Sequence, residues 1–290
     1  MLREIRDLGF EYAELSHGIR VSLVPGILEA VDAGEIRIST LHNFCPLPIG
    51  INHAAPNIFK FSSPDRRERD SAWKHSMKTL EMAERVKAKL IVLHTGEVPL
   101  KDYNDKLESM VAAGQRDTPK YRKLVEEMER KREAAKEIPM QLAFEFITLL
   151  SEQAASRGLL LGIENREAVE EIPFDYELDH FVGQLPQNVA RYWHDCGHAQ
   201  IKHHLGLLEH RMHLENLAPM LGGFHVHDVV ASPEDGLRDH CPPGVGEVPF
   251  EQLKPFVKPE HIKTLELNPG IAAEDVVKGY EFIRSVWGPE

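Results

Sequence analysis

The stretch "LLLGIEN", residues 159–165, is a short apolar run that ends on a carboxylate, Glu164. A continuous apolar run of this length is typical of a strand buried on both faces, as in a parallel sheet. The stretch "AKLIVLHTG" (88–96) has the same form and ends with His94. Five further strand candidates are separated by helical patterns, at residues 12–15, 36–44, 188–195, 222–228 and 262–270. Short strands that alternate with helices predict βα units around a parallel sheet.

Seven such units in 290 residues predict an α/β protein, a (β/α)₈ TIM barrel that occupies residues 1–290 as a single domain. No GxGxxG turn is present, which argues against a dinucleotide-binding sheet. Residues 1–9 already have the pattern of the helix that should follow the first strand, so we expect the first strand to be absent or truncated. A charged helical insertion is expected at about 98–137, after the fourth strand when the missing one is counted, with most of it facing solvent.

Composition limits the classes of function. The net charge of −12 argues against nucleic acid as the main partner, because it repels phosphate. No apolar run is long enough to span a membrane, and the N-terminus lacks the pattern of a signal peptide. Three cysteines favour a reducing, cytoplasmic environment over a disulfide framework. The sequence leaves a homo-oligomer open.

The strand candidates after residues 12–15 all end on histidine or acidic residues. Because the carboxyl ends of barrel strands converge on one mouth, we expect these side chains to gather there. One such histidine would normally be a hydrogen-bonded core residue, but six ends in series favour a divalent cation that compensates the buried groups. The residues are His42, His94, Glu164, Asp195, His198, His225, His227 and Glu266.

The predicted metal ligands are three carboxylates and one imidazole: Glu164, Asp195, His225 and Glu266. Such a hard, mostly oxygen site suits Mn²⁺ best and admits Mg²⁺, Zn²⁺ or Co²⁺. His225 is preferred to His227, which follows it by two residues on the same strand. His198, just past its strand, is expected to contact the substrate.

The motifs "GIENREAVEEIP" (162–173), "YWHDCGHA" (192–199), "HVHD" (225–228) and "LELNPG" (265–270) resemble the xylose isomerase-like TIM barrel superfamily. The resemblance runs from about Leu8 to Trp287 and is strongest to the branch of sugar phosphate isomerases and epimerases, which is related to AP endonuclease family 2. It implies a metal-dependent isomerase or epimerase of sugars or sugar phosphates. The reaction would pass protons through an enediolate.

The resemblance also implies roles for single residues. Glu164 and Glu266 match the two metal-bound glutamates that act as acid and base, and His198 would assist catalysis. "DHCPPGVGEVPF" (239–250) is similar to the loop after the seventh strand, from which His240 would reach the site. The predicted substrate contacts are Arg166, His42, His94, His198, His227 and His240. For Arg166, a structural ion pair at the rim is an equal alternative.

Three other functions stay open. A type IV-like AP endonuclease with three zinc ions could draw its ligands from His42, His94, Glu164, Asp195, His198, His225, His240 and Glu266. An inosose dehydratase-like lyase would use the same metal, and a non-catalytic sugar-binding relative would keep the fold without turnover. We also expect most histidines of "KHHLGLLEHRMHL" (202–214) to lie at the surface.

Overall fold

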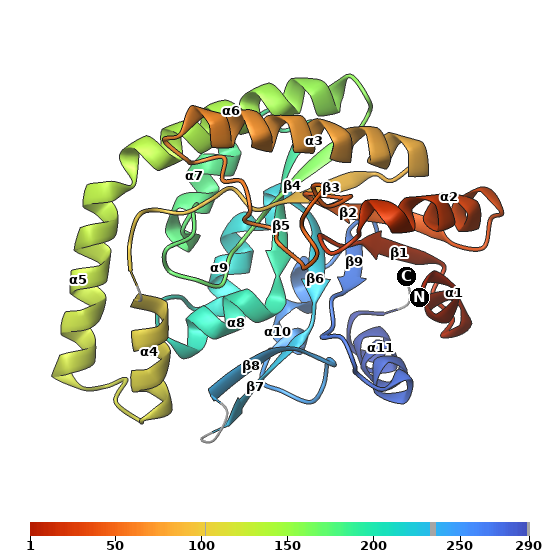
Figure 1. Cartoon of the computed structure of the whole chain (residues 1–290). Helices are drawn as coiled ribbons and strands as arrows, with labels where there is room; N and C mark the ends of the chain where they lie inside the picture. The colour runs from red at the N-terminus through yellow and green to blue at the C-terminus, as the bar shows by residue number, and fades with distance from the viewer. Residues whose placement is uncertain (102, 233–235, 289–290) are drawn as a thin grey trace. The chain divides into compact units, whose positions relative to one another are not determined.

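Seven parallel strands make up the main sheet of the protein (Figure 1). The computed structural model describes residues 1–101, 103–232 and 236–288. The strands follow the order β1-β2-β3-β4-β5-β6-β9. Their bounds are Tyr12–Leu15, Arg37–His42, Leu90–Leu93, Leu160–Glu164, Ala190–Asp195, Leu221–Val226 and Ile262–Leu265. Each coincides with a strand expected from the sequence, and the predicted TIM-barrel class is confirmed.

Helices lie between the strands, as expected for βα units. The first is α1, Leu2–Asp7, which precedes β1 as predicted. Within the described ranges the sheet has no eighth parallel strand, in agreement with the expectation of a missing first one. The other α-helices are α2 Val24–Asp32, α3 Arg66–Val86, α4 Tyr103–Ala112, α5 Pro119–Ala135, α6 Glu137–Ala155, α7 Leu178–Gly183, α8 Cys196–His204, α9 His210–Leu217, α10 Phe250–Leu253 and α11 Ala273–Trp287. Short 3₁₀ turns are η1 Val21–Leu23, η2 Asp175–Glu177, η3 Ala218–Met220 and η4 Lys254–Phe256.

The chain divides into two compact units, each made of three segments. Unit 1 comprises Met1–Gly96, Ile138–Glu164 and His180–Arg191. Unit 2 comprises Glu97–Glu137, Asn165–Asp179 and Tyr192–Glu290. The assignment of residues 1–290 to a single domain stays a prediction.

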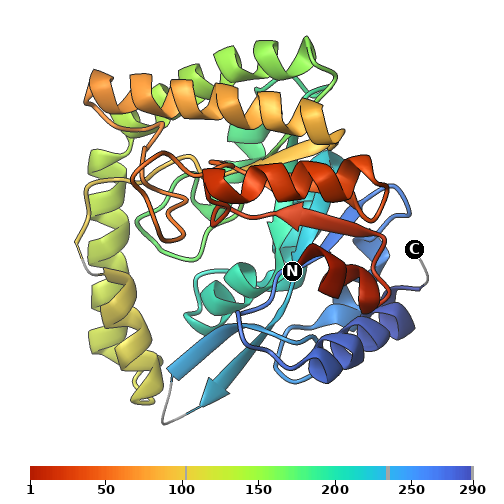
Figure 2. The same cartoon turned by 45° about the vertical axis from the view of Figure 1, so that its right-hand side comes forward.

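Unit 1 is built around strands β1 to β4. All four residues of β3 are buried, which explains their continuous apolar sequence. Helix α3 begins directly after Asp65, whose carboxylate caps the helix by accepting from the N–H of Arg67 at 2.8 Å. Helices α3 and α6 run side by side (Figures 1 and 2), and Trp73 of α3 meets Phe146 of α6 edge to face. Aromatic packing therefore joins these two helices.

Unit 2 contains an antiparallel hairpin that the sequence did not indicate. Its strands are β7, Asp228–Ser232, and β8, Gly236–Cys241, and they pair outside the parallel sheet. In Figures 1 and 2 the hairpin extends from β6 beside α8. No strand was expected after residue 228, because the two short strands lack the apolar run that marks a buried parallel strand.

A single carboxylate organises the loop that follows this hairpin. Asp228 accepts hydrogen bonds from the backbone N–H groups of Val229, Gly244, Gly246 and Val248 at 2.8 to 2.9 Å. A Cβ at Gly246 would lie 2.2 Å from the carbonyl oxygen of Val229, so the loop requires glycine there. This loop follows directly on the strand that carries His240.

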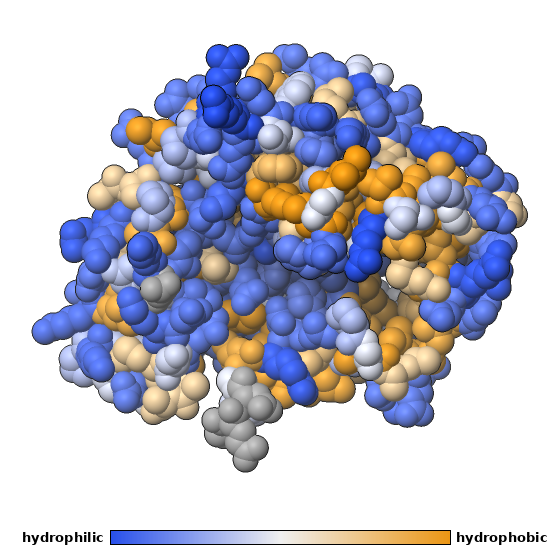
Figure 3. All heavy atoms as spheres, viewed as in Figure 1, coloured by the Kyte–Doolittle hydropathy of each residue, from blue (hydrophilic) through white to orange (hydrophobic). Residues whose placement is uncertain are grey.

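The predicted insertion at about 98–137 is helical, with residue 102 outside the described residues. Most of α5 is exposed, and hydrophilic atoms prevail over it at the left of Figure 3. Its buried residues are Tyr121, Met128 and Arg132, and Arg132 donates from Nη2 to Glu177 at 2.7 Å, while Lys136 lies 2.9 Å from the same carboxylate. Helix α5 of the insertion is therefore largely solvated and is anchored to η2 by ion pairs to the buried Glu177.

The surface location predicted for the histidines of residues 202–214 is wrong for two of them. His210 and His213 on α9 are 1% and 8% exposed. They face β5, where His210 Nε2 lies 3.0 Å from His194 Nε2 and His213 Nε2 lies 3.0 Å from the Tyr192 hydroxyl. A helical pattern alone cannot distinguish a buried polar face from an exposed one, so this cluster could not be predicted from the sequence.

Burial in this cluster should make the protein sensitive to mild acid. Burial, with nearby His213, lowers the pKa of His210 from 6.5 to about 3, so His210 stays neutral when folded but binds a proton when unfolded. The stability that the neutral His210 contributes to the folded state is fully present above pH 6.5 and is lost as the pH falls from 6.5 towards 3. Between pH 7.5 and 5.5, the proton that His210 binds only in the unfolded state should lower the free energy of unfolding by about 1.4 kcal/mol. Urea denaturation of His210→Gln should show a pH dependence weaker by that amount. The exposed His53→Gln is the control, and equal pH dependence in all three proteins would contradict the prediction.

Candidate metal centre

In unit 1, two imidazoles and a carboxylate meet at the ends of adjacent strands. His42 ends β2, His94 follows β3, and Glu164 ends β4. His94 Nε2 lies 3.0 Å from Glu164 Oε2, and His42 Nε2 lies 3.9 Å from the same oxygen. All three side chains are buried. The structure therefore brings together three of the residues that the strand ends predicted.

The hydrogen bonds of these two histidines suit a metal ligand. The Nδ1 of His42 lies 3.2 Å from the carbonyl oxygen of Asn43, and the Nδ1 of His94 lies 2.9 Å from Asn57 Oδ1. Both partners are oxygen acceptors, so each Nδ1 donates its proton to one of them and each ring turns its Nε2 towards Glu164. A proton on Nε2 joins an imidazole to a carboxylate, and the same three donor atoms are also of the kind that could hold a cation.

A third histidine of unit 1, His17, was missed by the sequence reasoning. Its ring centroid lies 4.7 Å from that of His42, and the His42 centroid lies 4.6 Å from that of His94. His17 follows the end of β1 by two residues, so the rule that strand ends carry the chemistry would have found it if extended to the first strand.

Unit 2 holds the other three predicted ligands: Asp195, His225 and Glu266. His225 Nδ1 lies 2.9 Å from Glu266 Oε2 and 3.7 Å from Asp195 Oδ2. Asp195 and His225 are fully buried, whereas the Glu266 side chain is 22% exposed. Two carboxylates and an imidazole thus converge, with Glu266 open to solvent, which is the donor chemistry that a hard divalent cation prefers.

Hydrogen bonds hold both the backbone and the carboxylate of Asp195. It ends β5 and caps α8, so that its Oδ1 accepts from the N–H of His198 at 2.7 Å. The amide of Asn165 clamps its backbone, accepting from the Asp195 N–H at 2.8 Å and donating to the Asp195 carbonyl at 2.9 Å. Asp195 is therefore fixed along its backbone and at Oδ1, while its Oδ2 lies 3.1 Å from His227 Nε2 and 3.7 Å from His225 Nδ1.

His227 serves Asp195 as a hydrogen-bond donor. Its Nε2 lies 2.9 Å from Asp195 Oδ1, and its Nδ1 accepts from the N–H of His240 at 2.9 Å. Burial lowers the pKa of His227, but the charge of Asp195 and the hydrogen bond to it outweigh burial and raise that pKa. A Cβ at position 197 would lie 2.0 Å from the His227 ring, so Gly197 lets the ring pack against the start of α8.

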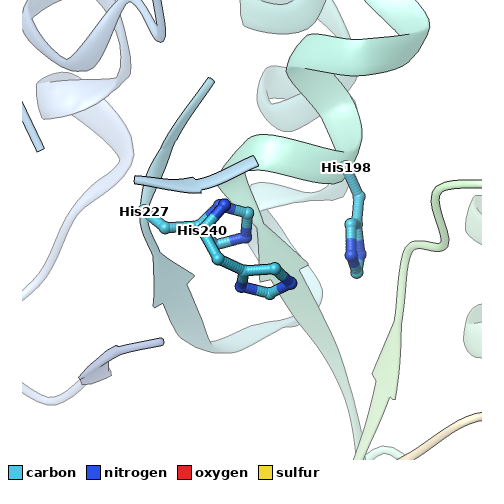
Figure 4. Close-up of side chains that lie close together, drawn as sticks. All are labelled: His198, His227 and His240. Carbon is cyan, nitrogen blue, oxygen red and sulfur yellow. The ribbon is translucent and has the colours of Figure 1, made fainter. Parts of the chain in front are cut away.

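His198, His227 and His240 form a cluster of imidazoles beside Asp195 (Figure 4). The rings of His227 and His240 stack with centroids 4.1 Å apart, and His198 faces them from α8. His240 adopts a positive φ of 47° and its Nδ1 lies 3.1 Å from the carbonyl oxygen of Glu266. Strand β8 of the hairpin thus brings His240 against His227, and its contact with a substrate stays a prediction.

Arg166 makes the structural ion pair that was one of its two expected roles, and its role as a substrate contact stays a prediction. Its Nε donates to Glu171 at 2.9 Å, which is the structural ion pair, and its Nη1 lies 3.4 Å from His198 Nδ1. Nearby Glu167 and Asp239 were not anticipated, although Glu167 follows Glu164 by one helical turn's spacing in "GIENRE". Burial, together with the charge of Asp239, raises the pKa of Glu167 to about 7.

The comparisons with known proteins agree with this arrangement of strands. A model of the xylose isomerase-like TIM barrel family matches residues 2–286. A search of curated proteins finds no match. No helix of the described residues is long and apolar enough to cross a membrane.

Three solved structures illustrate the likeness in fold. A D-tagatose 3-epimerase-like protein is 18% identical, with a TM-score of 0.65 over 98% of this chain and 90% of its own. D-Psicose 3-epimerase from Clostridium cellulolyticum H10 is 14% identical, with a TM-score of 0.65 over 99% and 93%. An IolI protein with a bound zinc atom is 13% identical, with a TM-score of 0.64 over 99% and 91%. At these identities the likeness establishes the fold, and with the family model it shows that the chain belongs to the xylose isomerase-like TIM barrel family.

Proposed function

We propose that this protein is a divalent-metal-dependent isomerase or epimerase of sugars or sugar phosphates. The observation that supports this most is the convergence of Asp195, His225 and Glu266, two of them fully buried, on one another. Charged groups at such depth are stable only with a compensating partner, and a divalent cation compensates all three at once. The similar folds include proteins described as sugar 3-epimerases and one that holds zinc.

Glu164 would be the fourth ligand. It ends β4, and the strand order places β5 and β6, which carry Asp195 and His225, between β4 and β9. Glu164 and Glu266 would therefore approach a shared ion from different strands. Mn²⁺ is the ion we propose, since three carboxylates and one imidazole form a mostly oxygen set, and Zn²⁺, Mg²⁺ or Co²⁺ are alternatives.

A bound cation would polarise the substrate carbonyl and stabilise the negative charge that develops when the neighbouring carbon loses its proton. The chain's own residues would move that proton. One glutamate, Glu164 or Glu266, takes a proton from one face of the carbon, and the other returns a proton to the opposite face. No proton is gained or lost overall, so the reaction inverts the carbon without a co-reactant.

Substrate contacts would come from the histidines around the ligands. His198 Nδ1 lies 3.1 Å from the carbonyl oxygen of Asn165, and its ring would contact a substrate oxygen through Nε2. His240 is 24% exposed at its side chain, so it is open to a ligand. Arg166, neutralised in part by Glu171, would bind a hydroxyl or phosphate from the rim. His42, His94 and His227 complete the proposed contacts.

A second candidate, a hydrolase of abasic DNA with three zinc ions, is favoured by one observation. Besides the ligands above, the histidine pair with Glu164 and the cluster of His198, His227 and His240 each place three donor atoms within 4.8 Å of one another. The net charge of −12 opposes a nucleic-acid substrate, and we therefore prefer the sugar enzyme.

The two-glutamate mechanism predicts a split between the two epimers. Glutamine keeps the shape of glutamate but cannot take a proton, so Glu164→Gln and Glu266→Gln should each lower kcat by about 10²- to 10⁴-fold. In D₂O with Mn²⁺, the remaining glutamate of each variant should still exchange the carbon-bound hydrogen of one epimer for deuterium. The epimer that exchanges should differ between the two variants. NMR of a converted ketose measures this exchange.

Asp195→Asn is the matched control for that experiment, because it removes a proposed ligand without removing a base. It should slow exchange equally for both epimers. Full activity in either glutamine variant, or equal exchange of both epimers by both variants, would contradict the assignment of the two bases.

The number of ions separates the two candidate functions. For the sugar enzyme we expect one tightly bound ion per chain by elemental analysis, loss of epimerisation after treatment with EDTA, and recovery with Mn²⁺. His94→Gln should leave that count unchanged. Three zinc ions per chain, loss of one in His94→Gln, and cleavage of a duplex with an abasic site would instead establish the hydrolase.

A further inference from the structure

Behind β5, a continuous chain of buried polar groups runs from helices α8 and α9 to the clamp on Asp195. Gln200 Oε1 lies 3.0 Å from His210 Nδ1, and His210 Nε2 lies 3.0 Å from His194 Nε2. His194 Nδ1 lies 2.7 Å from the hydroxyl of Tyr192, which lies 2.9 Å from Asn165 Oδ1. Every member of the chain is at most 4% exposed.

Such a chain is costly to bury, because each unsatisfied polar group loses its hydration. An apolar core of the same volume would stabilise the fold without needing matched partners. None of the four outer members, Gln200, His210, His194 and Tyr192, belongs to the proposed ligands or substrate contacts. Their common end point is Asn165, whose amide holds the backbone of Asp195 on both sides.

The contacts select one direction for the protons. A tyrosine hydroxyl has one proton, and Asn165 Oδ1 can only accept, so the proton of Tyr192 must lie on that bond or two oxygen lone pairs would face each other. His213 Nε2 lies 3.0 Å from the same hydroxyl, so both His194 Nδ1–H and His213 Nε2–H must then donate to Tyr192, and His194 Nε2 must accept from His210. His210 Nδ1 is left as an acceptor, which requires the Gln200 side chain to present its NH₂ group.

We propose that Gln200, His210, His194 and Tyr192 are positioning residues that form a directional hydrogen-bond relay, which ends on Asn165 and fixes the backbone of Asp195. The relay acts on the orientation of Asp195, and it is formed in the metal-free protein. Its consequence for metal affinity rests on the proposed function, whereas its existence does not. A weaker clamp would let Asp195 leave the position in which its Oδ2 faces His225.

The direction of the relay is tested by ¹⁵N NMR of the metal-free wild type. We expect His194 to be protonated at Nδ1 and unprotonated at Nε2, and His210 to be unprotonated at Nδ1 and protonated at Nε2. The N–H protons of both rings should exchange slowly with solvent. The opposite tautomers, or rapid exchange of both protons, would overturn the relay.

The effect on Asp195 is tested by hydrogen exchange of its amide in the same metal-free protein. Tyr192→Phe should speed that exchange by roughly tenfold, since the clamp loses one hydrogen bond. Tyr121→Phe is the matched control, because its buried hydroxyl donates to the Leu205 carbonyl at 2.6 Å and does not touch Asn165. Equal exchange of the Asp195 amide in both variants would overturn the proposal.

A pair of substitutions at His194 keeps the test decisive if Tyr192→Phe does not fold. Asparagine can donate from a position close to that of Nδ1, and leucine cannot. His194→Asn should therefore preserve the slow exchange of the Asp195 amide, and His194→Leu should lose it. No difference between them would count against the relay.

Titration with Mn²⁺ links the relay to the proposed metal site. Tyr192→Phe should bind Mn²⁺ about 10-fold or more weakly than wild type, and Tyr121→Phe should bind it unchanged. Unchanged affinity in Tyr192→Phe would overturn the effect on the ligand. If the wild type binds no divalent ion, the proposed function fails, and the NMR and exchange results still decide the relay.

Discussion

The burial of carboxylates and imidazoles at the carboxyl ends of parallel strands is the constraint on which the rest of the structure depends. Asp195 and His225 are fully buried, and Glu164 is 1% exposed. Such buried polar and charged groups destabilise a fold unless each has a polar partner, and each of these three side chains has one. Glu164 faces the Nε2 atoms of His42 and His94, and His225 faces the carboxylates of Asp195 and Glu266.

Local structure outside the strands serves the same constraint. Asp228 gathers four backbone N–H groups and thereby shapes the loop that follows His240. Gly197 leaves room for the ring of His227 against α8, and Asn165 clamps the backbone of Asp195. The chemistry therefore depends on residues that never reach a substrate, and their loss should loosen the site while the sheet stays folded.

Sequence reasoning located the strands and their last residues well, because a strand buried on both faces must be apolar until it meets the mouth of the barrel. "LIVL" before His94 and "LLLGI" before Glu164 show this directly. The β7–β8 hairpin, Glu167 and Asp239 were missed, since loop shape depends on contacts distant in sequence. The burial of His210 and His213 was also missed, because nothing in a helical pattern shows that a polar face meets a polar strand.

Anomalous X-ray diffraction at the manganese edge, from crystals grown with Mn²⁺, would test the central claim most directly. We expect one dominant peak, coordinated by Asp195, His225, Glu266 and Glu164, with His227 still bonded to Asp195 and not to the ion. No peak at these residues, or a dominant peak bound only by the three histidines 198, 227 and 240, would show that the buried strand-end groups are compensated in another way.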